Sequence, residues 1–331
     1  MKKPHARPTG YATDPTWPAL QAFLPADFHF SAETLPTETF WDWRGHQIHL
    51  DRFEHPSSPV TIILLHGVGT NGRQLSLIVG GPLWQRGIAT VALDLPTYGQ
   101  TRVAHRAQVT YDDWVRLVCD FSAAERRRTG RPVVLYGLSA GGMLAYHAAA
   151  LDRELAGIIG MTFLDQRVQW VRDATASHPL MSRIGGPVAV LAAKTPFGSI
   201  TLPMRLAAKM HTLVNHPAAL RVMLADPTSA GTWVTLRFLA SYLRYQPACE
   251  PEAFTVCPIL LTQPAADRWT PLALSEVVLQ RVTQVPVTWV LLDQAGHYPL
   301  EEPGLTQMAE AIVTFIKGLP AGAVSTPHAA M

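Results

Sequence analysis

A serine flanked by glycines follows an apolar stretch near the middle of the chain. Val133 to Tyr136 lead into Gly137-Leu138-Ser139-Ala140-Gly141, and a run of small residues comes next. A nucleophilic serine needs a sharp turn between a strand and a helix, because its hydroxyl must stand clear of the backbone. Glycine two positions before and two positions after the serine removes Cβ atoms that would clash there. The pattern predicts Ser139 as a nucleophile; a plain glycine-rich turn is the alternative.

A serine hydroxyl needs a base at neutral pH. Among 13 histidines, His297 is the best placed, because it directly follows the apolar stretch Val285–Leu292 in Gly296-His297-Tyr298-Pro299. The carboxyl ends of parallel strands are where an open α/β sheet gathers its active site. We therefore predict His297 as the base, with an ordinary loop histidine as the alternative.

The base needs an acid that orients its imidazole and stabilises the imidazolium. Asp267 follows the strand-like run Pro258–Thr262, one predicted strand before the run that leads to His297. Asp165 also ends a predicted strand after Ser139 and remains the rival acid. Asp293 is closest to His297 in sequence, but it ends its own strand and is predicted to be structural. The favoured triad is Ser139, His297 and Asp267.

The oxyanion that forms during acyl transfer needs two backbone N–H donors. The residue after the nucleophile, Ala140, supplies the first, and the loop after the strand Val60–Leu65 is expected to supply the second through Val68.

The same loop carries a motif of another functional class. Gly67-Val68-Gly69-Thr70-Asn71-Gly72 is a G-x-G-x-x-G sequence after a strand, and Asp94 ends the next strand. That spacing is typical of a dinucleotide-binding site. An NAD-dependent oxidoreductase is therefore kept as a remote alternative, although it leaves Ser139, Asp267 and His297 unexplained.

Strands and helices alternate along most of the chain, which predicts a mostly parallel sheet flanked by helices. An antiparallel hairpin is expected at one edge, where Glu38–Trp43 and Gln47–Phe53 flank Arg44-Gly45. The other predicted strands are Val60–Leu65, Thr90–Leu93, Pro132–Tyr136, Ala156–Leu164, Pro258–Thr262 and Val285–Leu292. The predicted helices are Gln74–Arg86, Tyr111–Arg128, Ala140–Leu151, Leu272–Val282 and Leu305–Lys317.

The alternation is interrupted once. Residues 165–251 show little strand character and are predicted to form a helical insertion, with helices over Gln166–Ala176, Pro203–Val214, Pro217–Leu224 and Thr232–Tyr245. The expected organisation is an irregular N-terminal arm (1–35), an α/β core (36–164 and 252–318), the insertion (165–251) and a flexible tail (319–331).

Composition narrows the class of protein. The chain has 331 residues, 48% of them hydrophobic, and a net charge of +2. No cluster of Lys and Arg suggests a nucleic-acid partner. Three cysteines form neither a disulfide framework nor a zinc motif, and no metal or cofactor is expected. The N-terminus lacks an apolar signal region and no long apolar run is present. We expect a cytoplasmic protein without integral membrane contact; the oligomeric state cannot be predicted.

Together these motifs resemble the α/β-hydrolase superfamily, in the branch of monoacylglycerol lipases, lysophospholipases and related esterases. The matching pieces are the His66-Gly67 loop, Asp94 to Gly99, the Ser139 turn, Asp267 to Pro271, and Gly296-His297. The resemblance spans about residues 37–318 and implies an eight-stranded sheet with a cap over the substrate pocket. The family usually has Gly where Thr97 stands here, which affects the pocket edge rather than the mechanism.

The resemblance implies a carboxylic ester hydrolase that works through an acyl-enzyme. The insertion is rich in large apolar residues, which predicts a greasy pocket and a substrate with a medium or long acyl chain, of monoacylglycerol or lysophospholipid type. The residues concerned are Trp170, Met181, Phe197, Met204, Met210, Leu213, Met223, Trp233, Phe238 and Leu239. A lactonase, a thioesterase or a carbon–carbon bond hydrolase using the same triad remains an alternative, as does a non-catalytic binder.

Overall fold

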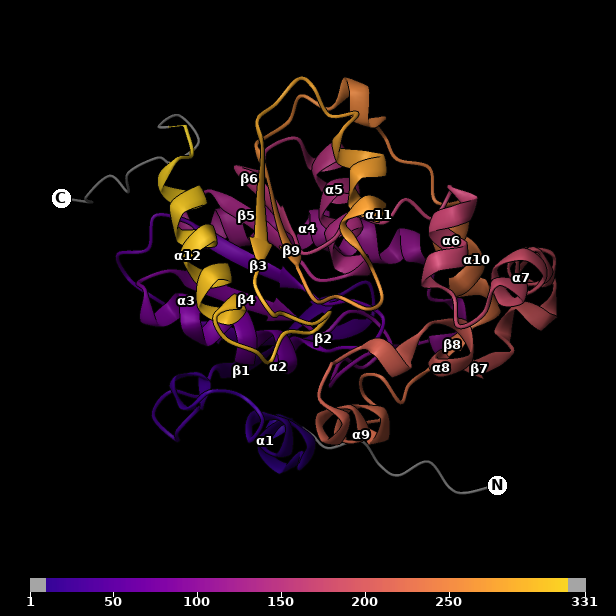
Figure 1. Ribbon diagram of the computed structural model, residues 1–331, viewed down its shortest axis with the longest axis horizontal. Coiled ribbons are helices and arrows are strands. Elements are labelled where there is room, and N and C mark those ends of the chain that lie inside the picture. Colours follow the sequence, from indigo (N-terminus) through magenta and orange to yellow (C-terminus); the bar gives the residue numbers. More distant parts are fainter. Residues whose placement is uncertain (1–9, 321–331) are drawn as a thin grey trace.

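An eight-stranded sheet forms the centre of the computed structural model, which describes residues 10–320 (Figure 1). The strand order is β1-β2-β4-β3-β5-β6-β9-β10. The pairs β1–β2 and β2–β4 are antiparallel, and all others are parallel. The strands are β1 (Thr37–Trp43), β2 (His46–Phe53), β3 (Thr61–Leu65), β4 (Ala89–Leu93), β5 (Val133–Gly137), β6 (Gly157–Gly160), β9 (Ile259–Pro264) and β10 (Val287–Leu292). The predicted fold class, with its antiparallel edge hairpin, is confirmed.

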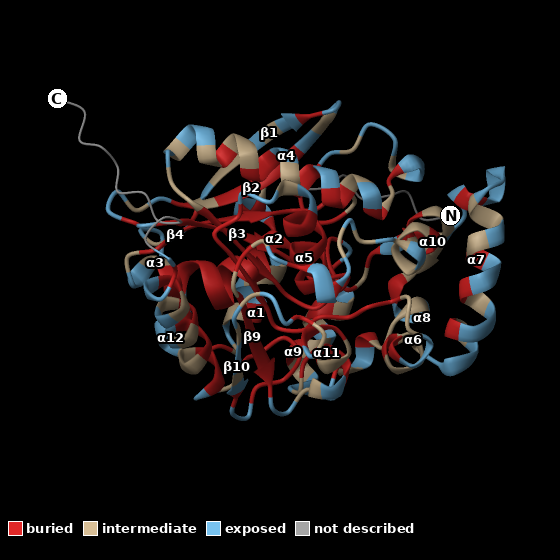
Figure 2. Ribbon diagram, turned by 90° about the horizontal axis from the view of Figure 1, so that it is seen from above, coloured by how far each residue is buried: buried red, intermediate tan, exposed pale blue. Residues whose placement is uncertain are grey.

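Helices cover both faces of this sheet. Contacts join α3 to α12 and α4 to α5, and these two pairs lie on opposite sides of the buried strands in Figure 2. Strands β3, β4 and β5 are buried along their whole length, as expected for parallel strands covered on both faces. The helices flanking the sheet are α2 (Gly72–Leu75), α3 (Gly81–Gln85), α4 (Tyr111–Thr129), α5 (Ala140–Asp152), α11 (Leu272–Leu279) and α12 (Gly304–Lys317).

Two predicted core elements differ in detail. The predicted helix Gln74–Arg86 starts earlier, because Asn71 and Gln74 form a capping box, and it contains a π-helical turn over Ser76–Gly80. The predicted strand Ala156–Leu164 ends at Gly160. It stops there because the N–H of Phe163 donates to Ser275 Oγ of α11 rather than to a neighbouring strand.

Residues 161–258, here called the β6–β9 segment, leave the sheet after β6 and return at β9. Their helices are α6 (Gln169–Thr175), α7 (Gly186–Ala193), α8 (Met204–Ala207), α9 (Pro217–Ala225) and α10 (Leu236–Arg244). A two-stranded sheet of β7 (Thr201–Pro203) and β8 (Trp233–Thr235) lies among them. The prediction of a helix from Thr232 is wrong for its first turn, because the aromatic and β-branched residues 233–235 pair with β7. Helix α7 has no predicted counterpart, since an entirely apolar run has no helical period.

The two ends of this segment are tied together near the sheet. The guanidinium of Arg167 lies 2.8 Å from Asp165 Oδ2 and 2.5 Å from Glu250 Oε1. At the other side, helix α1 (Thr16–Gln21) of the N-terminal region contacts α9. The predicted irregular arm therefore contains a short helix, while residues 1–9 of the arm and 321–331 of the predicted tail lie outside the described part.

A buried network of charges links the N-terminal region to the sheet. His49 on β2 lies between two carboxylates: its Nε2 is 2.8 Å from Glu38 Oε2, and its Nδ1 is 3.0 Å from Asp94 Oδ2. The Tyr11 hydroxyl donates to both Asp94 oxygens at 2.9 Å. Burial alone lowers the pKa of His49, but the two carboxylates outweigh it and raise the pKa to about 10. His49 is thus held as a buried imidazolium.

The free energy of unfolding should therefore fall as the pH rises from 7 to 9. The unfolded chain loses the His49 proton near pH 6.5, whereas the folded protein keeps it to about pH 10. Each pH unit in this window removes up to about 1.4 kcal/mol. Urea unfolding at pH 7, 8 and 9 measures this slope; the buried thiols of Cys119 and Cys257, whose pKa values are raised to about 12, add their own dependence above pH 9.

A His49→Gln variant serves as the control for this titration. It should be less stable than the wild type at pH 7 and should lack most of the slope between pH 7 and 9. A wild-type free energy of unfolding that stays constant over this range would contradict the assignment.

The turn after β4 contains a threonine in a backbone conformation that favours glycine. Thr97 has a φ of +83°, which is strained for a β-branched residue. Gly99 in the same turn has a φ of +50°, and a Cβ on it would lie 1.9 Å from Asp94 Cγ. The departure from the family pattern at Thr97 therefore carries backbone strain.

Two substitutions in this turn should have opposite effects on stability. Thr97→Gly should raise the free energy of unfolding by up to about 1 kcal/mol, because the relieved strain exceeds the entropy that glycine adds to the unfolded chain. Gly99→Ala should lower it by several-fold more, since the new methyl overlaps the buried carboxylate of Asp94. Thermal unfolding of both variants measures this, and a destabilised Thr97→Gly variant would refute the strain argument.

Candidate active site

Ser139 lies in the sharp turn between β5 and α5. Its φ of +57° and ψ of −121° place it in a strained conformation. A Cβ on Gly137 would lie 2.0 Å from the carbonyl oxygen of Gly141, and a Cβ on Gly141 would lie 2.2 Å from that of Leu65. Only glycine fits at either position, so the two glycines allow the turn and the turn holds the Ser139 side chain in a fixed place.

Ser139, Val68 and Ala140 line the same pocket. Ala140 is the first residue of α5, so its N–H has no partner within the helix. Among the hydrogen bonds of the described residues, none uses the N–H of Val68. The loops β3–α2 and β5–α5 thus each bring a residue with a backbone N–H to the pocket that Ser139 lines.

His66 fixes the orientation of one of these donors. The N–H of Leu95 donates to His66 Nε2 at 2.9 Å, so the ring carries its proton on Nδ1 and donates it to the carbonyl of Gly67 at 2.7 Å. Complete burial lowers the pKa of His66 to about 4, which keeps the ring neutral. In a trans peptide the N–H points opposite to the carbonyl, so this bond directs the Val68 N–H away from His66.

Asp267 and His297 form a buried pair at the ends of β9 and β10. His297 Nδ1 lies 2.9 Å from Asp267 Oδ2. The carboxylate also accepts the backbone N–H groups of Trp269 and Thr270, at 2.7 and 2.8 Å, and the Thr270 hydroxyl at 2.6 Å. Burial raises the pKa of Asp267, but the imidazole and these hydrogen bonds outweigh it and lower the pKa overall. The carboxylate is therefore ionised and can orient the ring.

Two neighbours of this pair, Thr270 and Trp269, were not recognised from the sequence. The Thr270 hydroxyl lies 3.0 Å from His297 Nδ1 as well as bonding to Asp267. The Trp269 ring packs on the His297 ring at 4.6 Å, and its Nε1 donates to the carbonyl of Thr175 on α6. Both residues lie within three positions after Asp267, so their closeness to the acid in the sequence was the available signal. Trp269 links the histidine to the β6–β9 segment.

The second ring nitrogen of His297, Nε2, is free of hydrogen bonds within the described residues. His297 Nε2 is buried and has no hydrogen-bond partner among residues 10–320, and no hydrogen bond joins it to Ser139. Trp269 packs on His297 and lines the pocket together with Ser139, so one side chain contacts the histidine and also borders the cavity that the serine lines. Catalytic hydrogen bonds are often long before substrate binds.

The two other acids considered for this role are engaged elsewhere. Asp165 accepts the N–H of Arg167 at 2.9 Å and pairs with its guanidinium. Asp293 accepts from Gln307 Nε2 at 2.9 Å on α12. Neither is bonded to His297 in the described residues, so the structure brings only Asp267 to the histidine.

The glycine-rich loop does not present a dinucleotide site. Asn71 caps α2 and the N–H of Gly72 donates to Asp94 Oδ1 at 2.7 Å. The Asp94 carboxylate is completely buried and already bound by Tyr11 and His49. No carboxylate oxygen of Asp94 is therefore exposed to bind a ribose.

One group of side chains has the composition of a metal site. The ligand atoms of Glu38, His49 and Asp51 lie within 4.8 Å of one another. The guanidinium of Arg73 lies 2.5 Å from Asp51 Oδ2 and 3.3 Å from Glu38 Oε1. Since Arg73 and the His49 imidazolium already neutralise the carboxylates, this group stabilises the fold without a metal ion.

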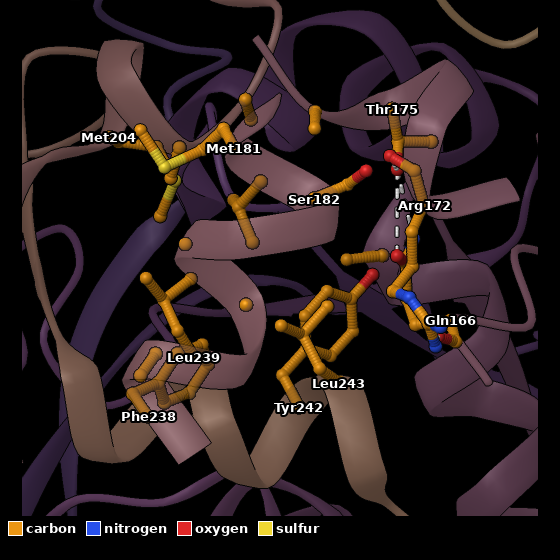
Figure 3. A pocket seen from close by; sticks show the side chains of 18 of the residues that line it. Gln166, Arg172, Thr175, Met181, Ser182, Met204, Phe238, Leu239, Tyr242 and Leu243 are labelled. Atoms are coloured by element: carbon orange, nitrogen blue, oxygen red, sulfur yellow. Dashed lines mark hydrogen bonds between the residues drawn. The ribbon is translucent and has the colours of Figure 1, made fainter. Parts of the chain in front are cut away.

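The pocket beside Ser139 extends into the β6–β9 segment and has a cavity volume of about 110 Å³. Trp269 and Leu164 line it on the core side. Figure 3 shows its apolar wall and, opposite, a narrower polar wall of Gln166, Arg172 and Thr175. The side chains of the apolar wall are Met181, Met204, Phe238, Leu239, Tyr242 and Leu243.

The profile of the alpha/beta hydrolase family matches residues 62–311, which is most of the chain and includes every residue of the predicted triad. The chain belongs to the alpha/beta hydrolase family. The resemblance that the motifs indicated is thereby confirmed, and the protein is a hydrolase rather than an NAD-dependent oxidoreductase. No curated protein sequence matches it significantly.

Solved structures of other hydrolases share this fold. A soluble variant of monoglyceride lipase from Saccharomyces cerevisiae superposes with a TM-score of 0.72 at 14% identity, covering 90% of this chain and 99% of that one. Monoacylglycerol lipase from Paleococcus ferrophilus has a TM-score of 0.63 at 17% identity, covering 81% and 98%. A thioesterase domain from the curacin biosynthetic pathway has a TM-score of 0.57 at 16% identity, covering 84% and 99%. At sequence identities of 14–17%, these similarities show that the proteins share a fold.

The Thr270 hydroxyl should support hydrolase activity through the orientation of His297. Thr270→Val, which keeps the shape and removes the hydroxyl, should lower kcat about tenfold and leave KM nearly unchanged, because Asp267 loses one donor and the imidazole gains freedom. Thr270→Ser should restore most of the activity. Steady-state kinetics of the three proteins measure this, and equal losses in the Val and Ser variants would show that the hydroxyl has no part in it.

Proposed function

We propose that this alpha/beta hydrolase is a serine hydrolase that cleaves carboxylic esters through a Ser139–His297–Asp267 triad. The observation that carries the proposal is the strained Ser139 turn in the lining of an apolar pocket, together with a buried, hydrogen-bonded His297–Asp267 pair. Serine as nucleophile favours acyl transfer, and the chain order serine, acid, histidine is that of this fold.

In the first step, the Ser139 hydroxyl oxygen attacks the ester carbonyl carbon while His297 Nε2 takes its proton. The unpartnered Nε2 of His297 is the atom that suits this role. Asp267 holds the ring through Nδ1 and stabilises the imidazolium without taking the proton. The negative oxygen of the tetrahedral intermediate accepts hydrogen bonds from the N–H groups of Val68 and Ala140, each worth about 3 kcal/mol in the transition state.

The intermediate collapses when His297 returns the proton to the alcohol oxygen, which leaves. An acyl-enzyme on Ser139 remains. A water molecule then attacks this ester, giving its proton to His297, and the second tetrahedral intermediate releases the carboxylic acid while Ser139 regains its proton. Both steps use the same two N–H donors, because the carbonyl carbon stays in one place.

The pocket favours an acyl group with a long apolar chain. Its walls are predominantly apolar, and methionines such as Met181 and Met204 adapt to flexible chains. The polar wall of Gln166, Arg172 and Thr175 offers hydrogen bonds to a polar part of the substrate. The fold likeness to monoglyceride lipases from yeast and Paleococcus ferrophilus supports a substrate of monoacylglycerol or lysophospholipid type.

A series of p-nitrophenyl esters from acetate to palmitate tests both parts of this proposal. The wild type should hydrolyse the series with kcat/KM highest at eight carbons or more, because each buried CH₂ contributes about 0.8 kcal/mol. Activity that is confined to acetate would contradict the acyl-chain assignment while leaving the triad in place.

A pair of variants distinguishes a loss of catalysis from a loss of folding. Ser139→Ala should lower kcat at least about 10³-fold without a change in melting temperature, and it should no longer react with a fluorophosphonate probe. Asp165→Asn is the control, because this acid lies outside the proposed triad; it should keep its probe reaction. Equal labelling of the wild type and Ser139→Ala would remove Ser139 from the nucleophile's role.

A further inference from the structure

The outer surface of the β6–β9 segment exposes a group of large apolar side chains that no described residue covers. Six of them come from residues 180–200 and are called the apolar ridge: Leu180, Ile184, Val188, Leu191, Phe197 and Ile200. Leu191 is 71% exposed and Phe197 65%. They belong to α7 and to the short helical turns before and after it, which contact α7 on both sides. An exposed apolar group of this extent marks an interaction surface.

Helix α7 is apolar on all sides, although it lies on the surface. Its sequence Gly-Pro-Val-Ala-Val-Leu-Ala-Ala has no polar side chain. Ala189 faces inward and lines the pocket beside Ser139, whereas Val188 and Leu191 face outward. Figures 1 and 2 show α7 at the end of the molecule opposite α12, and α7 packs against α10. Such a helix is expected in an apolar medium rather than in water.

The charges near the apolar ridge are mostly positive. Residues 161–258 contain nine Lys or Arg and five acids. Of these acids, Asp226 is buried and Asp173 pairs with Arg183 at 2.8 Å. The β6–β9 segment therefore carries a net charge of +4 (9 − 5), and the rest of the chain carries −2 (18 − 20). Lys194 and Arg205 are exposed and form no ion pair with any residue of the described range 10–320. The segment that carries the ridge is therefore net positive, whereas the rest of the chain is net negative.

We propose that the apolar ridge and its basic surroundings dock on the surface of an anionic phospholipid bilayer. The ridge enters the boundary between head groups and acyl chains, and Lys194 and Arg205 contact lipid phosphates. No helix in residues 10–320 is long enough to cross a membrane, so the contact is peripheral. A second copy of the chain is a poorer occupant, because two ridges would bring two sets of like charges together.

Docking in this way would bring the pocket to the source of a lipid substrate. In this arrangement helix α7 lies between the bilayer and the pocket. Leu191 faces the membrane and Ala189 faces the pocket. This consequence depends on the proposed ester hydrolase function. The docking itself does not, because it follows from the exposed residues and charges alone.

Flotation with phospholipid vesicles tests the docking independently of catalysis. The wild type and Ser139→Ala should both float with vesicles of phosphatidylcholine and phosphatidylglycerol (7:3), and much less with phosphatidylcholine alone. Val188→Glu/Leu191→Glu should bind at least about tenfold more weakly, because two apolar anchors become charged. Lys194→Glu/Arg205→Glu should bind about fivefold more weakly for each cation removed, and 1 M salt should reduce wild-type binding.

Two controls carry the same chemical changes outside the ridge. Leu151→Glu at the end of α5 and Arg127→Glu on α4 alter exposed residues of the core and should leave vesicle binding within twofold of the wild type. The proposal is overturned if the wild type stays unbound, or if the controls lose as much binding as the ridge variants. It is also overturned if Val188→Glu/Leu191→Glu converts a wild-type dimer to a monomer in analytical ultracentrifugation, since the ridge would then be a contact between copies.

Discussion

The close approach of three backbones at Ser139 is the constraint on which the rest of the structure depends. A Cβ on Gly141 would lie 2.2 Å from the Leu65 carbonyl of β3, and a Cβ on Gly142 would lie 1.9 Å from the carbonyl of Thr162 after β6. The turn fits only because β3, β5 and β6 are adjacent in one parallel sheet. The same adjacency brings Val68, at the end of β3, to the side of the serine. The order of the strands therefore determines both the geometry of the Ser139 turn and the position of the backbone N–H groups next to it.

The sequence predicted the elements whose patterns are local. The edge hairpin, the strand runs and the Ser139 turn were foreseen because period, glycine placement and β-branched residues each have a direct physical meaning. The site was predicted in part. The pairing of Asp267 with His297 was expected because both residues follow the carboxyl ends of strands in one parallel sheet. The contacts of Thr270 and Trp269 could not be predicted, because they depend on side-chain directions that the spacing of residues in the sequence does not reveal. Helix α7 was missed because its run from Gly186 to Ala193 has no polar face. Trp233–Thr235 forms a strand because residues 30 to 34 positions earlier pair with it.

Two of the buried histidines, His66 and His49, show how the environment decides the protonation state of one type of side chain. His66 and His49 are both fully buried. His66 meets one N–H donor and one carbonyl, so burial prevails and the ring is neutral; His49 meets two carboxylates, so the ring is charged. The neutral ring sets the direction of a peptide beside Ser139, and the charged one secures Asp94 and the Tyr11 region. Neither role is visible in the residue type alone.

The clamp of Arg167 on Asp165 and Glu250 makes the β6–β9 segment modular. Because β6 and β9 are neighbours in the sheet, with Ile158 beside Ile259, the chain leaves and re-enters the core at almost the same point. Closing so long a loop costs only slightly more entropy than closing a shorter one, since this cost grows with the logarithm of length. Evolution can thus lengthen, shorten or replace the segment while the sheet and the serine turn stay intact. Because the pocket walls and the proposed membrane-docking ridge both lie in this segment, a single replacement of the segment would change both.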